Sequence, residues 1–209
     1  MGDEWPPAPP DGYRKHDPEY DQPWHITAIL YVWLVSVFAG VPALVLGVHG
    51  LDTVVAIIRN LLQPDGANEW VLYLGWTAGT LGIWIGGHEL LHALVARWFG
   101  LQTRFDIEYN HPLDWTPAIV TYGEFQSRSQ SLAITLAPLV VLTPLGVVAI
   151  VTGQDLWVIA SGTVIALANS AGAIGDLASA WVVCHLPEGE LLYHDREGRR
   201  QYYKPTNGN

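Results

Sequence analysis

The chain has 209 residues, of which 50% are hydrophobic and only 14% are charged. Its formal net charge of −10 argues against a nucleic-acid partner, because such a partner requires a basic surface. A single cysteine, Cys184, excludes an intramolecular disulfide framework.

The N-terminal segment, residues 1–25, is rich in prolines and charges. It lacks the basic region followed directly by an apolar core that marks a signal peptide. We therefore expect residues 1–25 to be a disordered, proline-rich cytoplasmic tail.

Four apolar blocks follow, and each is long enough to cross a bilayer, which takes about 20 residues. A short amphipathic segment, residues 51–62, comes after the first block and is expected to lie on the outer membrane surface. The pattern predicts an α-helical integral membrane protein with four transmembrane helices, in a domain covering residues 26–185. The four blocks are residues 26–50, 70–99, 131–152 and 156–184.

Two hairpins are predicted outside the apolar blocks. Residues 103–108 and 118–125 alternate in the manner of strands and flank a turn-prone region, which predicts a small cytoplasmic β-hairpin. The C-terminal tail, residues 186–209, is expected to be cytoplasmic and to hold a second hairpin over residues 190–204, turning near Glu197-Gly198.

The basic residues predict the orientation in the membrane. They precede the first block, lie at or within the connection between the second and third blocks, and follow the fourth block, whereas the two remaining connections hold only Arg59. Because cytoplasmic loops carry an excess of Lys and Arg, both termini are expected to be cytoplasmic in a multi-pass protein of the cell membrane. These residues are Arg14, Lys15, Arg97, Arg104, Arg128, Arg196, Arg199, Arg200 and Lys204.

The second block contains an HExxH motif, His88-Glu89-Leu90-Leu91-His92. On a helix, this spacing sets two imidazoles one turn apart on one face with a carboxylate beside them, which is a zinc site with its own general base. Ionisable side chains are costly in an apolar environment, so a functional role is favoured over simple packing.

A zinc site for hydrolysis needs a third protein ligand, and Asp176 is the only acidic residue besides Glu89 inside the four blocks. At about 1.5 Å of rise per residue, the two histidines lie roughly 9 to 15 Å from Trp98, and Asp176 lies about 13 Å from His185. Both sets are thus expected at one depth, with Zn²⁺ held by His88, His92 and Asp176. Rival third ligands in loops or at interfaces are Asp106, Glu108, His111, Glu124 and His185.

Asn169 precedes Asp176 by seven residues and falls on nearly the same helix face. Its amide is a candidate to stabilise an oxyanion or to hold the substrate backbone, and the alternative is an interhelical hydrogen bond. Small residues in the second block form two GxxxG pairs, which predict close helix packing against the fourth block. These glycines are Gly75, Gly79, Gly82 and Gly86.

The motifs resemble those of the zinc intramembrane metalloproteases of the site-2 protease type, and more closely those of the putative zincin peptidase family. The resemblance rests on GHELLHALVARWFG at residues 87–100, the Leu136-Ala137-Pro138-Leu139 run, and the segment from Asn169 to Gly175-Asp176. It departs from site-2 proteases because residues 168–177 contain no proline and Gly175 precedes Asp176. The resemblance implies hydrolysis of peptide bonds.

The sequence therefore predicts a zinc-dependent intramembrane or membrane-associated metalloprotease, with Glu89 as general base and Asn169 as a second catalytic residue. Its partners are expected to be the lipid bilayer and a membrane protein or peptide substrate, and the oligomeric state is left open. One alternative is a non-enzymatic membrane zinc protein, which would need four closed protein ligands. Another is a metal transporter, which would place polar residues on several spans.

Overall fold

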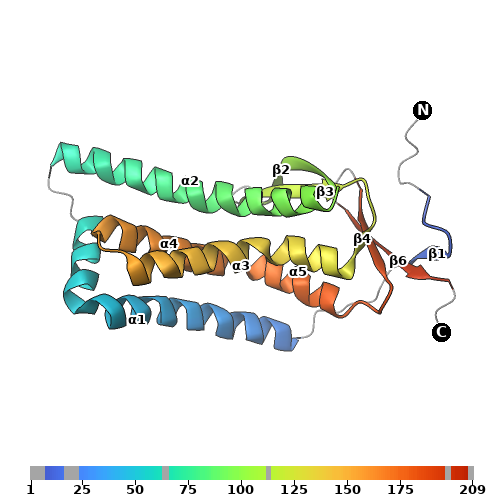
Figure 1. Cartoon of the computed structure of the whole chain (residues 1–209), viewed down its shortest axis with the longest axis horizontal. Helices are drawn as coiled ribbons and strands as arrows, with labels where there is room; N and C mark the ends of the chain where they lie inside the picture. The colour runs from blue at the N-terminus through green and yellow to red at the C-terminus, as the bar shows by residue number, and fades with distance from the viewer. Residues whose placement is uncertain (1–7, 17–23, 63–65, 112–113, 196–198, 207–209) are drawn as a thin grey trace. The chain divides into compact units, whose positions relative to one another are not determined.

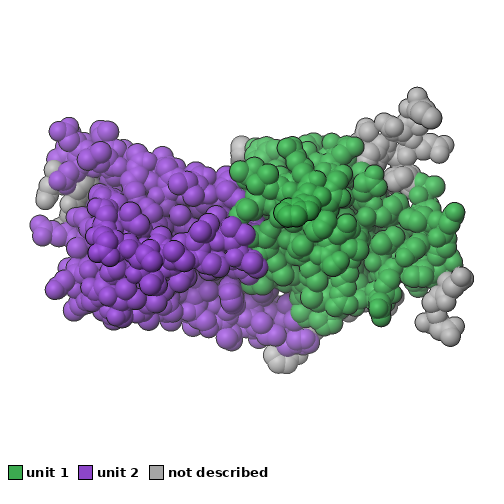
Figure 2. Space-filling model, viewed as in Figure 1, with its two compact units in different colours: residues 1–23, 89–137, 176–209 green, residues 24–88, 138–175 purple. Residues whose placement is uncertain are grey.

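The computed structural model describes residues 8–16, 24–62, 66–111, 114–195 and 199–206. The described chain is mostly helical, with small antiparallel strand elements. It divides into two compact units, coloured separately in Figure 2. Unit 1 comprises Met1–Pro23, Glu89–Ala137 and Asp176–Asn209, and unit 2 comprises Trp24–His88 and Pro138–Gly175.

Unit 2 is helical and begins with α1 (Trp24–Leu62). Gly50 interrupts α1 with φ 81° and ψ 175°, a conformation that glycine adopts without steric cost, and Figure 1 shows the resulting bend. The break lies at the end of the first predicted span, so residues 51–62 form a separate helical segment after it. The other helices that contribute to unit 2 are α2 (Ala67–Trp98), α3 (Arg128–Thr152) and α4 (Leu156–Gly172).

Helices α3 and α4 approach each other at two glycines. A Cβ added to Gly146 would lie 2.8 Å from the backbone nitrogen of Ala166 and 2.8 Å from the carbonyl oxygen of Gly162. The small residues let the two backbones touch, and the adjoining core of unit 2 is built from apolar side chains of α1, α3 and α4. That core contains Val45, Ile57, Ile150, Ile159, Ala160 and Ala166.

The predicted GxxxG contact of the second block is wrong. A Cβ added to Gly75, Gly79, Gly82 or Gly86 would meet no other atom within 4 Å, so these glycines do not mediate close packing in the described structure. The close backbone approach instead occurs between α3 and α4, at Gly146 and Gly162, neither of which belongs to a GxxxG pair. Glycine spacing alone does not identify the helix face that meets a neighbour.

Two described helices are long and apolar enough to cross a membrane, α1 over His25–Asn60 and α3. Helix α4 and α5 (Ile174–Cys184) are bent by 44° at a short break and would make a third span if counted together. Many large apolar side chains on these helices are exposed, which is expected of a surface facing lipid. These features are consistent with a membrane protein and support two or three of the four predicted spans.

Unit 1 contains two antiparallel sheets. In the first, the strand order is β1 (Tyr13–His16), β6 (Arg200–Pro205), β5 (Leu191–His194) and β4 (Gln126–Ser127). The second pairs β2 (Gln102–His111) with β3 (Asp114–Tyr122). The antiparallel strand pairing of both predicted hairpins is thereby confirmed, although the turn expected near Glu197-Gly198 lies outside the described residues.

The prediction of a disordered tail over residues 1–25 is wrong at Tyr13–His16, which form β1. This strand pairs with β6 from Tyr13 opposite Pro205 to His16 opposite Tyr202, and His16 Nε2 lies 2.9 Å from Glu190 Oε1. The local composition is poor in apolar residues, so the segment gives no strand signal of its own. Its order comes from a partner strand at the other end of the chain.

The Gly146 contact predicts opposite effects for the same substitution at two helical glycines. Gly146→Ala should lower the free energy of unfolding by about 1 to 3 kcal/mol, because its methyl group would press on the backbone of α4. Gly79→Ala is the matched control and should be neutral or stabilising by up to about 1 kcal/mol, since its methyl group enters open space. Thermal unfolding in detergent micelles measures both, and equal effects would contradict the close contact.

A pH dependence is predicted for the sheet of unit 1. Burial of the imidazole, with the Arg200 guanidinium beside it, lowers the pKa of His194 from 6.5 to about 4. Arg200 Nε donates to His194 Nε2 at 3.3 Å, which requires the neutral ring. Between pH 6.5 and 4 the unfolded chain binds a proton that the folded chain does not, so stability should fall as the pH drops through this range.

Thermal unfolding of the full chain at several pH values tests this. His194→Gln should flatten the profile between pH 6.5 and 4. A profile that keeps its slope in His194→Gln would show that another group is responsible.

Candidate metal centre

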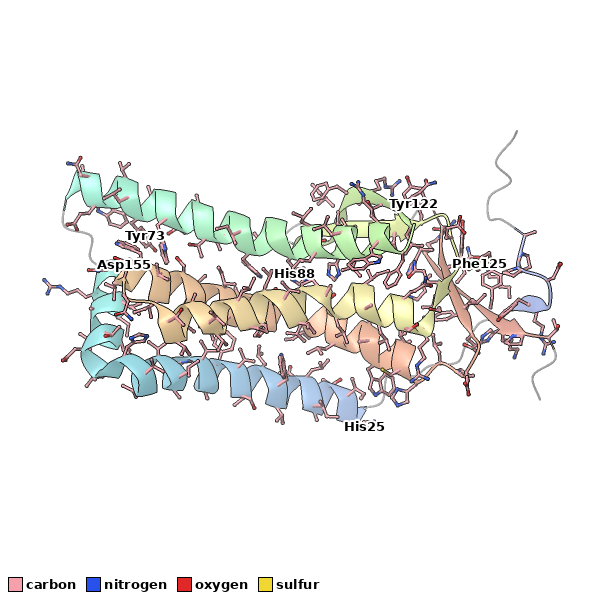
Figure 3. All side chains as sticks on the ribbon, viewed as in Figure 1. His25, Tyr73, His88, Tyr122, Phe125 and Asp155 are labelled. Atoms are coloured by element: carbon pink, nitrogen blue, oxygen red, sulfur yellow. The ribbon has the colours of Figure 1, made fainter. Side chains whose placement is uncertain are left out.

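Helix α2 carries the HExxH motif without a break. His88 is the last residue of the first segment of unit 2, and Glu89 is the first residue of the next segment of unit 1. Because the helix is continuous, its own geometry fixes His88 one turn from His92 on the same face. Figure 3 labels His88 on this helix.

In unit 1, His92 is oriented by the backbone of α3. Its Nδ1 lies 2.8 Å from the carbonyl oxygen of Ile134. A carbonyl only accepts, so Nδ1 carries a proton, and in the neutral ring Nε2 carries the lone pair. That Nε2 lies 3.6 Å from Asp176 Oδ1, and the two side chains are 13% and 20% exposed.

In unit 2, Asn169 orients His88. The Asn169 side chain lies on α4, is fully buried, and has its Oδ1 2.9 Å from His88 Nδ1. Its Nδ2 donates to the carbonyl oxygen of Pro138 at 3.0 Å, which fixes the orientation of the amide. The amide oxygen therefore faces the ring, His88 Nδ1 donates, and Nε2 holds the lone pair, as in His92.

Asp176 lies in the first turn of α5, directly after the break between α4 and α5. The sequence predicted one continuous span over residues 156–184, but α4 ends at Gly172 with Ala173 as its cap, and a new helix begins at Ile174. The N-terminal turn of a helix favours a negative charge, because its N–H groups and dipole point toward it. The break thus gives a carboxylate in apolar sequence a favourable local environment.

The structure brings together the three ligands predicted from the sequence. Nitrogen atoms of His88 and His92 and a carboxylate oxygen of Asp176 all lie within 4.8 Å of one another. In a tetrahedral zinc site with bonds of 2.0–2.1 Å, two ligand atoms are separated by about 3.3 Å, close to the 3.6 Å between His92 and Asp176. Two imidazoles and one carboxylate are a donor set that suits Zn²⁺, with a fourth position left for water.

Glu89 is not part of this ligand group. Its Oε2 accepts a hydrogen bond from the backbone N–H of Ile119 in β3, at 2.9 Å, within unit 1. This N–H therefore points at α2 and not at β2, which lies along the other edge of β3. This contact was not predictable from the sequence, because a backbone donor leaves no signal in the residue type.

Where the structure describes the rival third ligands, their side chains are exposed, and two of them make contacts elsewhere. Asp106 is bound by Arg104 at 2.7 Å and is exposed, and Glu124 is exposed as well. His185 is exposed and contacts its own helix, with its ring 4.2 Å from that of Trp181. The side chains of Glu108 and His111 lie outside the described residues.

Comparisons with known proteins give one match. A family model described as "putative zincin peptidase" matches residues 81–191, slightly more than half of the 209 residues. The match includes both histidines of the motif, Glu89, Asn169 and Asp176. A comparison with curated proteins and one with solved structures found no match.

The ligand assignment predicts the metal content of the full chain purified in detergent. Asp176→Ala should weaken zinc binding by more than about 100-fold, because loss of a direct ligand exceeds the effect of losing an outer partner. Asp106→Ala removes an exposed carboxylate that is bound to Arg104 and should leave zinc binding unchanged. Full zinc occupancy in Asp176→Ala, measured by elemental analysis and chelator competition, would assign the third ligand elsewhere.

Proposed function

Because the chain belongs to the putative zincin peptidase family, we propose that it is a zinc-dependent metalloprotease that hydrolyses peptide bonds within or at the surface of a membrane. One observation carries the proposal. His92 Nε2 lies 3.6 Å from Asp176 Oδ1. The imidazole of His88 lies one helical turn from His92, and Glu89 follows His88 in the chain. This is the donor set of a hydrolytic zinc site with an adjacent base.

His88, His92 and Asp176 would hold the ion. When bound, Zn²⁺ supplies a Lewis acid that polarises a carbonyl and lowers the pKa of a water in its fourth position toward 7. Glu89 takes a proton from the attacking water and passes it to the nitrogen of the leaving amine. Among the described residues the group comprises three ligand residues, which favours hydrolysis with water in the fourth position over a structural zinc site, because a structural site would require a fourth protein ligand.

The contact between Glu89 and β3 suggests how substrate binding and catalysis are coupled. In the described residues, β3 is paired only with β2, so its other edge can accept an extended peptide by strand addition. A substrate carbonyl that accepts the Ile119 N–H would replace Glu89 as its partner. Substrate binding would then release the carboxylate to act as a base.

We further propose that α2 also crosses the membrane, which gives four spans with both termini cytoplasmic. Helix α2 is 32 residues long, which is sufficient for a bilayer. Its histidines and glutamate lower its apolar character, which is the expected consequence of carrying a catalytic site at membrane depth. A helical membrane substrate would have to unwind before cleavage, because its backbone groups are otherwise bonded internally.

The substitution Glu89→Gln tests the function. It should retain zinc and lower the cleavage rate by about 10²- to 10⁴-fold, because the amide cannot accept the proton of the attacking water. The assay uses the full chain in proteoliposomes, with unfolded β-casein and an epitope-tagged single-span membrane protein as probes. The control Glu124→Gln changes an exposed carboxylate in the connection between α2 and α3, and this variant should cleave at the rate of the unmodified protein.

The outcome that opposes the proposal is specific. If the unmodified protein cleaves a probe and Glu89→Gln cleaves it equally fast, Glu89 is not the base and the zincin mechanism is excluded.

A further inference from the structure

A buried polar network lies within the apolar helices of unit 2. Asn169 on α4 contacts three groups, with distances of 2.9 Å to His88 Nδ1, 3.0 Å to the carbonyl oxygen of Pro138 and 2.9 Å to Thr143 Oγ1. The last two lie on α3. The Asn169 side chain is entirely shielded from solvent, so each of these hydrogen bonds replaces a contact that water would otherwise supply.

The network continues beyond Asn169. Thr143 Oγ1 lies 3.1 Å from Ser170 Oγ, and Trp33 Nε1 of α1 donates to the carbonyl oxygen of Ser170 at 3.0 Å. The network therefore joins α1 and α3 to the part of α4 that contains Asn169, the residue that contacts His88. Such a network holds its members in one arrangement, because any displacement leaves buried polar groups without partners.

We infer that Asn169 is a positioning residue, held by Thr143, which keeps His88 in the tautomer that presents Nε2 to the metal. The inference rests on the proposed zinc site and assigns a role to each atom of the amide. Both N–H groups of Asn169 are engaged by Pro138 and Thr143, and the oxygen accepts from His88. No donor of the amide remains for an oxyanion, so the catalytic role considered from the sequence is replaced by control of a ligand.

Outer partners of metal-bound histidines fix the ring orientation and the tautomer, and their loss typically weakens metal binding by about 10- to 100-fold. The partner here is a neutral amide, and its own orientation depends on a carbonyl and a hydroxyl of α3. Thr143 therefore acts through Asn169 and has a smaller expected effect. The sequence does not distinguish Thr143, because one hydroxyl in an apolar helix carries no specific signal.

The first experiment measures the zinc dissociation constant of the full chain in detergent by competition with a chromophoric chelator. Asn169→Leu should raise the constant by about 10- to 100-fold, and Thr143→Val should raise it by a smaller factor. Thr143→Ser keeps the hydroxyl and should restore binding. Thr163→Val is the matched control on α4 and should bind zinc normally, because its hydroxyl bonds only to Ile159 O among the described contacts.

The second experiment repeats Asn169→Leu in a His88→Ala background. A residue that acts only through His88 should have no further effect once the imidazole is gone, which a double-mutant cycle measures. Circular dichroism of each variant reports whether the helices are intact, and Thr143→Val gives the same test with a milder change if Asn169→Leu does not fold. Zinc affinity also separates positioning from oxyanion binding, since loss of an oxyanion donor would lower kcat and leave the affinity unchanged.

Unchanged zinc affinity in Asn169→Leu, or an equal loss in the presence and absence of His88, would overturn the inference and leave the protease proposal intact. Conversely, weakened zinc binding in Asn169→Leu combined with full cleavage by Glu89→Gln would support the positioning role and remove the protease mechanism. If the unmodified chain binds no zinc at all, both proposals fail together.

Discussion

A neutral imidazole has one proton and one lone pair, and the rest of the candidate site depends on which nitrogen carries which. In both histidines of the motif, Nδ1 faces an oxygen that can only accept in that arrangement, the Ile134 carbonyl for His92 and the Asn169 amide for His88. Each Nε2 is thereby left with its lone pair. These two hydrogen bonds thus favour the tautomers that would present both Nε2 atoms to a metal ion.

Two backbone carbonyl oxygens of α3 set the orientations of the two histidines. The carbonyl of Ile134 accepts from His92 directly, while the carbonyl of Pro138, one turn further along, orients the amide that contacts His88. The histidines are spaced by four residues on α2, and these two carbonyls are spaced by four residues on α3. Tight contact between α3 and α4 at Gly146 and Gly162 keeps the Asn169 amide within reach of α3.

Residue type made much of the site predictable. Ionisable side chains are rare in apolar sequence, so His88, His92 and Asp176 stood out, and the structure brings their ligand atoms within 4.8 Å. Contacts made by the backbone or by common residues left no such signal. The Ile119 N–H on Glu89 and the Thr143 hydroxyl follow from the fold, and β1 is ordered only by a strand at the opposite end of the chain.

The break between α4 and α5 places the carboxyl group of Asp176 at the start of a helix. In one continuous helix, Asp176 would lie mid-helix, where the backbone N–H groups are already bonded within the helix. Because a new helix begins at Ile174, Asp176 instead lies in a first turn, where the helix dipole favours a negative charge. The bend that shortens the predicted span therefore helps to place the carboxylate of the candidate site in a favourable local environment.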